Sequence, residues 1–504
     1  MQAKAAYEEL IRLARERALL ASCIALLAWD EETYMPPGGA AHRAEQLAYL
    51  AGLEHEKATD PRIGERLGYV DQSDLTSDPL SDAAVNVREW RRQYGRLTRL
   101  PRPLVEETAR VTSLAQAEWA AARRDADFAR FRPWLERVTV LKRREAEAIG
   151  GAAELYDALL DEYEPGATAR GLEPLFAVLS KDLLELAGVL AAAPRRPNPA
   201  VLRRDYPVER QRAFGEAAAV ALGFDFRRGR LDDTTHPFFA VMGPGDCRIT
   251  TRYSPRDFGD AFFSALHEAG HGLYEQALDP SLYGLPVGEA PSLGAHESQA
   301  RLWENVVGRR RAFWEHFYPL ARQAFPSALG DVGMAEFHFA VNAVGPSLIR
   351  VRADEVTYDL HILARFQLER ALIAGDLRPA ELPAAWNEAY RRLLGVAPAN
   401  DAEGCLQDGH WAAGLIGYFP TYTLGNVIAA QLFARAETDL GGVDRAFARG
   451  DFSALLGWLR ERFYSPGGRF PTARLVEEAS GARPDPRPLA AALRRKYEEL
   501  YGAA

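Results

Sequence analysis

Apolar residues recur along most of this chain at the spacing of an amphipathic α-helix, and this period limits the folds open to it. Near the amino terminus, one apolar stripe with charged residues between its members comprises Tyr7, Leu10, Ile11, Leu13 and Ala14. Similar stripes run through residues 83–125, 132–150, 171–193, 302–320, 356–373 and 452–464. Strand-like alternation is scarce and is clearest at residues 247–253 (CRITTRY), which are rich in β-branched and aromatic side chains. The sequence therefore predicts a mainly α fold with a small β element.

The length and composition describe a large globular protein. At 504 residues, the chain is long enough for about three domains of roughly 150 residues each. A hydrophobic fraction of 47% and a charged fraction of 26% are globular averages, which exclude a disordered or fibrous chain. The motifs described below run from residue 29 to residue 422 and have to meet at one site, so we expect a single domain over residues 1–504. Within it we expect a mostly helical flanking half (1–200), a catalytic core (201–425) and C-terminal helices (426–504).

The charge balance and the apolar runs exclude two classes of partner. Lys and Arg total 61 against 70 Asp and Glu, a net charge of −9, which provides no basic face for nucleic acid. The longest apolar run, residues 19–29, is too short for a bilayer span of about 20 residues, and we interpret it as a buried helix. Its mixed-charge flank does not resemble a signal peptide. Three cysteines without a CxxC pair suit a reducing compartment, so we expect a cytoplasmic protein without membrane partners.

The HExxH pattern His267-Glu268-Ala269-Gly270-His271 marks a candidate metal site. On a helix, residues i and i+4 share a face, so His267 and His271 can reach one ion while Glu268 stands beside them. Independent signals predict a helix here, with Ser254 as its N-cap and Pro280 after its end. An apolar stripe supports it, comprising Phe258, Phe262, Leu266, Leu273 and Ala277.

A carboxylate from a following helix would complete a His₂Glu zinc site and leave the fourth position to water. Glu297 is the first candidate, because it lies 26 residues after His271 and opens a second apolar-periodic helix. Glu304 is the second candidate and Glu289 the third. We interpret His296 as a polar neighbour of the ligands, since the ligand set is full without it.

This ligand set indicates amide hydrolysis. Zn²⁺ lowers the pKa of a bound water towards about 7 and polarises the scissile carbonyl. Glu268 is the candidate general base, which takes the proton of the water and passes it to the leaving amine. The pattern therefore predicts a metallopeptidase.

Further motifs follow one another along the chain: Trp29-Asp30 with residues 35–39 (MPPGG), His236-Pro237-Phe238, residues 246–250 (DCRIT), residues 296–301 (HESQAR), residues 349–354 (IRVRAD), residues 404–411 (GCLQDGHW) and residues 418–422 (YFPTY). In these motifs, and over essentially its whole length, the chain resembles the carboxypeptidase Taq family, thermostable metallocarboxypeptidases with an HExxH zinc motif. The family usually has Ser where this chain has Ala300, which puts one hydrogen bond beside the metal site in doubt.

The resemblance implies a large, mainly α, saddle-shaped zincin fold with a central groove, related to neurolysin and angiotensin-converting enzyme. It implies a carboxypeptidase that releases single residues from the carboxyl termini of peptides, with broad specificity. It also implies zinc, or else cobalt, one divalent ion per chain, and a homodimer. By resemblance, the motifs at 246–250 and 404–411 close one end of the groove, where Gln407 and Asp408 hold loops together.

An exopeptidase has to recognise a free carboxylate, which a planar guanidinium can hold through two hydrogen bonds. Arg350 is the first candidate, with Arg352 and Arg248 behind it. An alternative is that Arg350 pairs with Asp354 at i+4 on the same helix.

The tetrahedral intermediate of amide hydrolysis needs hydrogen-bond donors aimed at its oxyanion. His236, His410 and Tyr422 are candidates, because each lies in a matching motif and can donate. The segment 246–250 is also a candidate edge strand that pairs with an extended substrate backbone.

Two other functions stay open at this stage. An endo-acting metallo-oligopeptidase shares the HExxH pattern and the downstream glutamate in a helical fold. A catalytically inactive helical binding protein is the other alternative, and the intact set of Glu268, both histidines and Glu297 argues against it.

Overall fold

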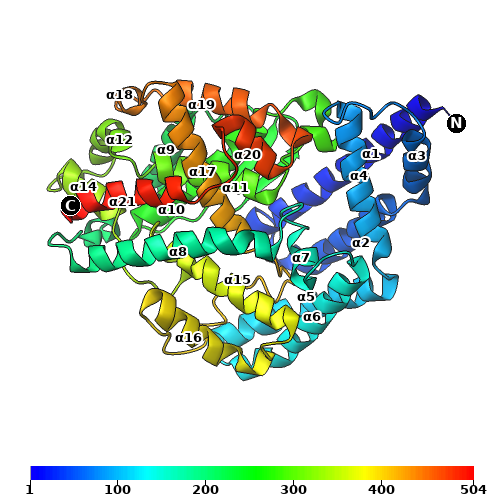
Figure 1. Ribbon diagram of the computed structural model, residues 1–504. Coiled ribbons are helices and arrows are strands. Elements are labelled where there is room, and N and C mark those ends of the chain that lie inside the picture. Colours follow the sequence, from blue (N-terminus) through cyan, green and yellow to red (C-terminus); the bar gives the residue numbers. More distant parts are fainter. Residues whose placement is uncertain (1, 504) are drawn as a thin grey trace.

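The structure is a computed structural model that describes residues 2–503, and it is mainly helical with one small sheet, as predicted (Figure 1). The helices before the sheet are α1 (Ala3–Thr33), α2 (Ala40–Ala58), α3 (Pro61–Asp71), α4 (Asp82–Arg99), α5 (Arg102–Asp125), α6 (Phe128–Ile149), α7 (Leu155–Leu160), α8 (Ala169–Ala192) and α9 (Val208–Leu222). The strands are β1 (Gly229–Asp233), β2 (Phe239–Gly243) and β3 (Asp246–Thr251). The helices after the sheet are α10 (Phe258–Glu275), α11 (Leu293–Arg301), α12 (Arg311–Ala324), α13 (Pro326–Leu329), α14 (Met334–Val341), α15 (Tyr358–Ala374), α16 (Leu382–Leu394), α17 (Pro420–Asp439), α18 (Asp444–Phe447), α19 (Ser453–Leu459), α20 (Thr472–Ser480) and α21 (Arg487–Tyr501).

The predicted apolar stripes are helical, but three of them are interrupted. The stripe over 83–125 is divided between α4 and α5, because Leu100 precedes a proline and is extended (ψ 118°). The stripe over 302–320 begins as the π-helical turn Leu302–Val307 before α12, and the stripe over 452–464 ends as another, Arg460–Tyr464. Periodicity thus located the helical regions but not the breaks within them.

Helix α17 lies between the two large apolar cores found within residues 2–503. One core is formed mainly by α5, α6, α8, α15, α16 and α21, and the other mainly by α9, α10, α12, α14, α19 and α20. Val427 on α17 belongs to the first core, and Ile428, the next residue, belongs to the second. Because α17 is buried on two sides, its amino-terminal turn is firmly placed beside the candidate site.

The apolar run at residues 19–29 is helical, as predicted, but our interpretation of it as buried is wrong. It forms part of α1, where Leu19 is 63% and Leu26 is 42% exposed, while Trp29 is buried. A third, smaller core covers only the first part of α1, through Ala6 and Leu10. The neighbouring α2 buries only its last residue, so this hairpin of helices covers little of the run.

The predicted β element at 247–253 is the central strand of a three-stranded sheet, with the order β1-β3-β2. β1 pairs with β3 in parallel, with Leu231 opposite Ile249, and β2 pairs with β3 antiparallel, with Phe239 opposite the same residue. Since β3 has a neighbour on each side, the prediction that residues 246–250 form an edge strand is wrong. The sheet packs against α10 through β3 and so supports the helix that carries the HExxH pattern.

Helix α10 begins later than the sequence signals predicted. Its N-cap is Asp257, whose side chain accepts a hydrogen bond from the backbone N–H of Asp260 at 3.1 Å. The predicted cap, Ser254, instead forms an isolated bridge with Asp257 in the turn before the helix. Asp257 is extended (φ −148°, ψ 106°), so the helix starts only after it.

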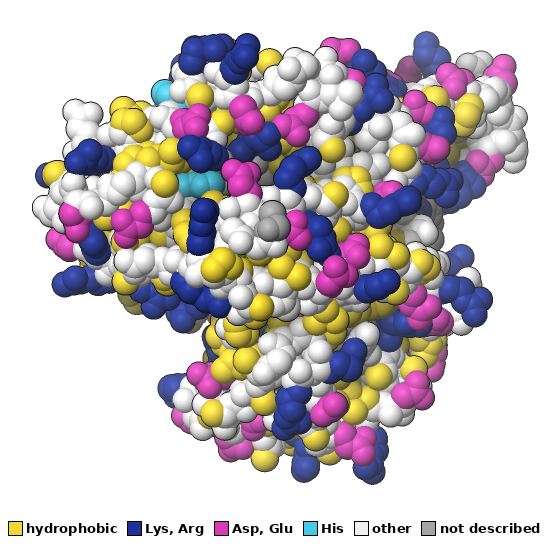
Figure 2. Space-filling view, turned by 60° about the vertical axis from the view of Figure 1, so that its left-hand side comes forward, with side chains coloured by type: hydrophobic (Ala, Val, Ile, Leu, Met, Phe, Trp, Pro, Cys, Tyr) yellow, Lys and Arg dark blue, Asp and Glu magenta, His cyan; other side chains and the backbone are white. Residues whose placement is uncertain are grey.

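The surface carries charges of both signs. On the face drawn in Figure 2, basic and acidic side chains are interspersed, and a lower lobe at the height of α16 in Figure 1 is set off by an indentation at its left. Among the helices described here, none combines the length and the apolar character that crossing a membrane would require.

Candidate active site

The candidate metal ligands lie where α10 and α11 approach each other closely. A Cβ atom on Gly270 would lie 2.6 Å from the carbonyl oxygen of Gln299 and 2.7 Å from Cα of the buried Ala300, so this approach requires glycine. Helix α17 also approaches α11 closely, since a Cβ atom on Gly425 of α17 would lie 2.7 Å from Cγ of Glu297. Two glycines within helices therefore allow α10 and α17 to pack closely against α11, which carries Glu297.

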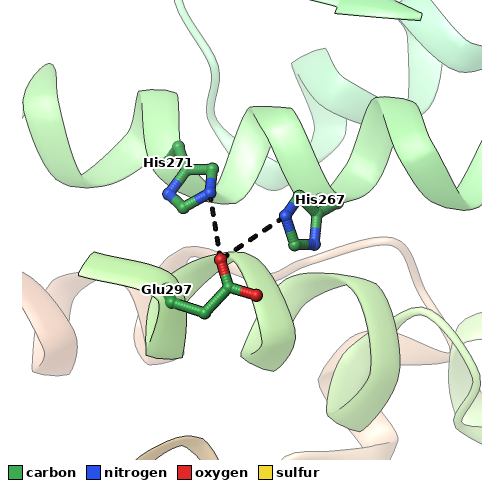
Figure 3. A group of neighbouring side chains, drawn as sticks. All are labelled: His267, His271 and Glu297. Carbon is green, nitrogen blue, oxygen red and sulfur yellow. Dashed lines mark ion pairs between the residues drawn. The ribbon is translucent and has the colours of Figure 1, made fainter. Parts of the chain in front are cut away.

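His267, His271 and Glu297 converge at this contact, and each offers a ligand atom within 4.8 Å of the others (Figure 3). Nε2 of His267 and Nε2 of His271 lie 3.7 and 3.5 Å from Oε2 of Glu297. The i, i+4 spacing places both imidazoles on one face of α10, and α11 presents the carboxylate opposite them. The three side chains chosen from the sequence are thus brought together.

This donor set fits a divalent metal ion. Ligands about 2.0–2.2 Å from a tetrahedral zinc ion lie about 3.3–3.6 Å from one another, which is close to the two nitrogen–oxygen separations given above. Two imidazole nitrogens and one carboxylate oxygen are a ligand set of catalytic zinc sites, and they leave one position for water or substrate. The geometry therefore allows a metal ion without rearrangement of the helices.

Glu304, the second candidate for the third ligand, lies behind His267. Its Oε2 is 2.9 Å from Nδ1 of His267, the ring nitrogen that does not face Glu297. Among residues 2–503, the cluster with metal-ligand spacing contains neither Glu304 nor Glu289. A carboxylate in this position fixes the tautomer and the orientation of a metal-binding imidazole.

The two oxygens of Glu297 have different partners. Nε of Arg301 donates to Oε1 at 2.7 Å, whereas Oε2 faces the two imidazoles. Arg301 also donates to Glu304 at 3.4 Å and to the hydroxyl of Tyr358 at 2.7 Å. One carboxylate oxygen is therefore fixed by a guanidinium while the other is left for a metal ion.

His296 is a polar neighbour of the ligands, in line with our interpretation of the sequence. Its Nε2 lies 2.9 Å from Oε1 of Glu275, and its ring stacks on His271 with the ring centroids 4.6 Å apart. Nδ1 of His271 is buried and has no hydrogen-bond partner among the described residues. The orientation of His271 therefore depends on stacking, whereas that of His267 depends on a carboxylate.

Burial and neighbouring charges shift the pKa values of the two histidines in opposite directions. Burial lowers the pKa of His267, but the charge of Glu297 and other nearby carboxylates outweighs it and raises this pKa to about 9. Burial, together with the neighbouring His296, lowers the pKa of His271 to about 3. Burial alone would raise the pKa of Glu297, but the charge of His267 helps to hold it well below its usual range. The metal-free cluster thus keeps a proton on His267, and metal binding has to release it.

Glu268 stands beside the ligands without joining them. It is 6% exposed, and in the part of the chain that the structure describes its carboxylate has no hydrogen-bond or ion-pair partner. Burial raises its pKa to about 7. A carboxylate without a fixed partner is available to exchange a proton with water.

Arg350 lies in the 3-10 turn Arg350–Arg352, and its predicted alternative partner at i+4 is wrong. Its Nε and Nη2 donate to Oδ1 of Asp408 at 3.1 and 2.8 Å. Asp354 instead accepts from backbone N–H groups before α15. The reason is that Ala353 is extended (ψ 144°) and separates the turn from the helix.

Gln407 and Asp408 bind two arginines. Oδ2 of Asp408 accepts from Nε of Arg365 at 2.7 Å, and Oε1 of Gln407 accepts from Nη2 of Arg365 at 2.8 Å. The backbone N–H of Arg350 donates to the same Gln407 oxygen at 2.9 Å. These contacts agree with the expectation that Gln407 and Asp408 hold loops together, and they fix Arg350 in place.

The other two arginine candidates have different surroundings. Arg352 is exposed and has no ion pair with any described residue. Arg248, on β3, donates to Asp246 at 2.8 Å and lies over the ring of Trp29 on α1, 4.1 Å from its centroid. Arg248 therefore connects the sheet to α1, a contact that the sequence did not predict.

Two of the three candidate oxyanion donors lie together. Nε2 of His410 is 3.4 Å from the hydroxyl of Tyr422, which lies in the first turns of α17. Burial lowers the pKa of His410 to about 4, and burial raises the pKa of Tyr422 well above its usual value. His236 is exposed between β1 and β2 and has no polar contact with any residue in the range 2–503.

Arg301 and Tyr358 both contact the site, although the sequence assigned a role to neither; Arg301 lies in the motif 296–301, and Tyr358 lies outside the motifs. Arg301 follows Glu297 at i+4, a spacing that indicates a side-chain pair on a helix. Tyr358 stands 57 residues from Arg301 and carries no comparable signal.

Comparison with known proteins gives one consistent result. The family model described as carboxypeptidase Taq (M32) metallopeptidase matches residues 9–497. A protein named thermostable carboxypeptidase 1 from Thermus thermophilus is 52% identical over 511 residues, with all of both chains covered. Carboxypeptidase 1 from Bacillus subtilis is 36% identical, with 98% of each chain covered. The crystal structure of an M32 carboxypeptidase from Deinococcus radiodurans superposes with a TM-score of 0.95 at 42% identity, over 99% of this chain and 100% of that one.

Proposed function

This chain belongs to the carboxypeptidase Taq (M32) family and is a metallocarboxypeptidase, and we propose that it releases single residues from the carboxyl termini of peptides, with broad side-chain preference and one zinc ion per chain. The observation that carries this proposal is that two imidazoles converge on Oε2 of Glu297, while Arg301 binds only its Oε1. Beside them lies Glu268, a carboxylate with no partner among residues 2–503. A ligand set and a separate base are what metal-assisted amide hydrolysis requires.

We propose that His267, His271 and Glu297 hold the ion. When bound, Zn²⁺ makes a water molecule more acidic and polarises the carbonyl group to be cleaved. Glu304 holds His267 in the tautomer that presents Nε2, and Arg301 holds Glu297 so that Oε2 faces the imidazoles.

Glu268 is proposed as the general base and acid of the reaction. Its carboxylate takes a proton from the attacking water and gives it to the leaving amine. We propose that Tyr422 and His410, whose polar atoms lie 3.4 Å apart, donate hydrogen bonds to the developing oxyanion. His236 stays a third candidate, which would have to approach from its exposed turn.

Arg350 is proposed to bind the carboxylate of the substrate. A guanidinium has five N–H donors, and the contacts with Asp408 and Tyr358 use three of them, one on each nitrogen. The two remaining N–H groups can bind the carboxylate of the substrate, and the ion pair with Asp408 fixes the position of the guanidinium. Arg352 and Arg248 are the alternatives, and of these Arg352 has no competing ion pair within the described residues.

The test uses one peptide in two forms, with a free carboxyl terminus and as its amide. Mass spectrometry of the digest should show a ladder of single-residue losses from the free acid and little loss from the amide, and a chelator should abolish both. Arg350→Ala should raise KM for the free acid, with Arg352→Ala as the matched control. Equal cleavage of the two forms would exclude the exopeptidase and favour the endo-acting oligopeptidase, while no hydrolysis by metal-loaded protein would favour a binding protein.

We also propose a single domain, a homodimer and a cytoplasmic location. The support for the homodimer is the family resemblance, and the support for the location is the cysteine usage.

A further inference from the structure

Tyr358 occupies a shared position between two arginines. It is the first residue of α15 and is 6% exposed. Its hydroxyl oxygen accepts a hydrogen bond from Nη2 of Arg301 at 2.7 Å and another from Nη1 of Arg350 at 3.1 Å. A phenol hydroxyl can accept hydrogen bonds, and this one accepts from both guanidinium groups.

Each of these arginines also donates to a carboxylate, through another nitrogen of its guanidinium group. Arg301 donates to Glu297, the candidate metal ligand, and Arg350 donates to Asp408. A continuous row of polar contacts therefore runs from Glu297 through Arg301, Tyr358 and Arg350 to Asp408.

The ring of Tyr422 borders the same row from one side. Its centroid lies 5.8 Å from Cζ of Arg301 and 5.1 Å from Cζ of Arg350. The rings of Tyr358 and Tyr422 are perpendicular, with centroids 6.3 Å apart. The two cations are thus kept close together by neutral aromatic groups, in a buried region where their mutual repulsion is weakly screened.

We propose that Tyr358 is a positioning residue that couples the metal ligand Glu297 to the carboxylate-binding Arg350, by giving Arg301 and Arg350 a common acceptor; this rests on the proposed function of Arg350. The two guanidiniums repel each other, and the shared oxygen fixes the distance between them. A shift of Glu297 moves Arg301 and, through this oxygen, changes where Arg350 presents its free N–H groups. By linkage, a carboxylate bound at Arg350 has the reciprocal effect on the metal site.

Tyr358→Phe tests the proposal, because it removes the shared acceptor and keeps the ring. Competition with a chromogenic chelator should show that the metal-free variant binds Zn²⁺ roughly tenfold more weakly than the metal-free wild type. A tenfold loss is the lower end of the range for residues that hold a metal ligand in place. KM for the free-acid peptide should rise roughly tenfold while kcat changes much less, since the loss is mainly of substrate binding.

Tyr390→Phe is the matched control. Its hydroxyl is also buried and accepts from an arginine, Arg365, at 3.2 Å, but Arg365 contacts Asp408 and not Glu297. This variant should leave Zn²⁺ affinity as in the wild type. Thermal unfolding of both variants shows whether they fold equally well.

Arg301→Lys provides a second test, which asks whether the row of contacts acts as a unit. Lysine keeps the charge but has no planar fork to join Glu297 with Tyr358. If the row acts as a unit, the losses of Zn²⁺ affinity in Arg301→Lys and in Tyr358→Phe will not add in the double variant.

The outcomes separate this proposal from the proposed function. A loss of Zn²⁺ affinity together with a rise in KM in Tyr358→Phe, both absent from Tyr390→Phe, and a loss of Zn²⁺ affinity that is not additive with that of Arg301→Lys, support the coupling. A loss in only one of the two quantities, equal losses in both tyrosine variants, or additive losses would overturn it. If the wild type cleaves the free acid and the amide equally, or Arg350→Ala leaves KM unchanged, the substrate role of Arg350 fails, and the coupling fails with it whatever happens to Zn²⁺ affinity.

Discussion

Two carboxylates at this site, the buried Glu297 and the partly buried Asp408, are satisfied in different ways. Glu297 receives one arginine on Oε1 and turns Oε2 towards two imidazoles. Asp408 receives Arg350 on Oδ1 and Arg365 on Oδ2, so both of its oxygens are occupied by cations. Both have a pKa well below the usual range, although burial acts to raise it, because cations lie beside them.

The difference separates a carboxylate available for a ligand from one that serves the structure. A metal ion needs an oxygen that is ionised but not already occupied, and Glu297 provides one. The pKa of Asp408 is also lowered, but both of its oxygens are occupied by arginines, so its role is to hold these two side chains. A low pKa alone therefore does not distinguish a candidate metal ligand from a structural carboxylate, whereas the occupancy of each oxygen separates Glu297 from Asp408.

The largest expected effect on activity concerns Glu268, a carboxylate in the same region with no cation on either oxygen among residues 2–503. Glu268→Gln should retain the metal and lose roughly 10²-fold or more of kcat, because a general base is removed. Metal content per chain and kcat on a free-acid peptide are the measurements. Glu297→Gln is the control, since it should lose the metal as well. Near-normal turnover by the Glu268→Gln variant would exclude Glu268 from the mechanism.

Asp408→Asn should destabilise the fold. Two buried arginines would lose their shared counter-charge, which is expected to lower the free energy of unfolding by about 3–5 kcal/mol. Glu297→Gln should cost much less in the metal-free protein, because Arg301 keeps Glu304 and Tyr358 as acceptors. Urea unfolding of both metal-free variants measures the difference, and equal losses would contradict the distinction between the two carboxylates.

Glu304→Gln tests the group behind a ligand. The amide can still accept from Nδ1 of His267, but the charge that favours a basic imidazole is lost, so metal affinity should fall roughly 10–100-fold. Chelator competition on the metal-free protein is the measurement. Glu315→Gln, in an exposed pair with Arg311, should leave the affinity unchanged. An unchanged affinity in Glu304→Gln would show that the contact does not support the metal.

The smallest effect is a pH dependence caused by Glu369, a buried carboxyl group that no cation in the described part of the chain hydrogen-bonds. It accepts from Trp411 at 2.8 Å, from Tyr156 at 2.9 Å and from the backbone N–H of Gly417 at 3.1 Å. Burial raises its pKa to about 7. The folded state thus binds this proton more tightly than the unfolded state, so the contribution of Glu369 to stability is present below the ordinary carboxyl pKa and is lost as pH rises through about 7.

Between pH 6 and pH 8 this loss should amount to about 1 kcal/mol. Urea unfolding at several pH values should show the decline in the wild type and a flatter profile in Glu369→Gln. Asp408 provides the opposite sign, because its lowered pKa makes its contribution fall only as the solution becomes strongly acidic. If the two profiles are parallel between pH 6 and pH 8, Glu369 is not the group responsible.

Local sequence spacing predicted the elements that carry the site. The i, i+4 relation of His267 and His271 and the amphipathic segment that opens at Glu297 both depend on a few adjacent residues, and the fold brings all three side chains together. The helix boundaries were less predictable, since Ser254 and Asp257 are both good caps and only the backbone of the turn decides between them.

The spacing of residues along the sequence did not predict which helices and strands other elements cover. The apolar run at 19–29 had the composition of a buried helix, yet Leu19 and Leu26 are exposed, because burial depends on what packs against a helix. In the same way, the strand at 246–251 had no signal that would make it central rather than an edge.

The sequence by itself determined the helical class, the family and the three candidate ligands, because these follow from short-range periodicity and from ordered motifs. Only the tertiary structure decided which oxygen of Glu297 stays open, that Asp408 rather than Asp354 holds Arg350, and that Tyr358 joins two arginines. The open oxygen of Glu297 depends on Arg301 in the same helix and on the two imidazoles that α10 brings opposite it. The pairs Arg301–Tyr358 and Arg350–Asp408 join residues 57 and 58 positions apart, so they arise only when α11, α15 and the segment before α17 pack together.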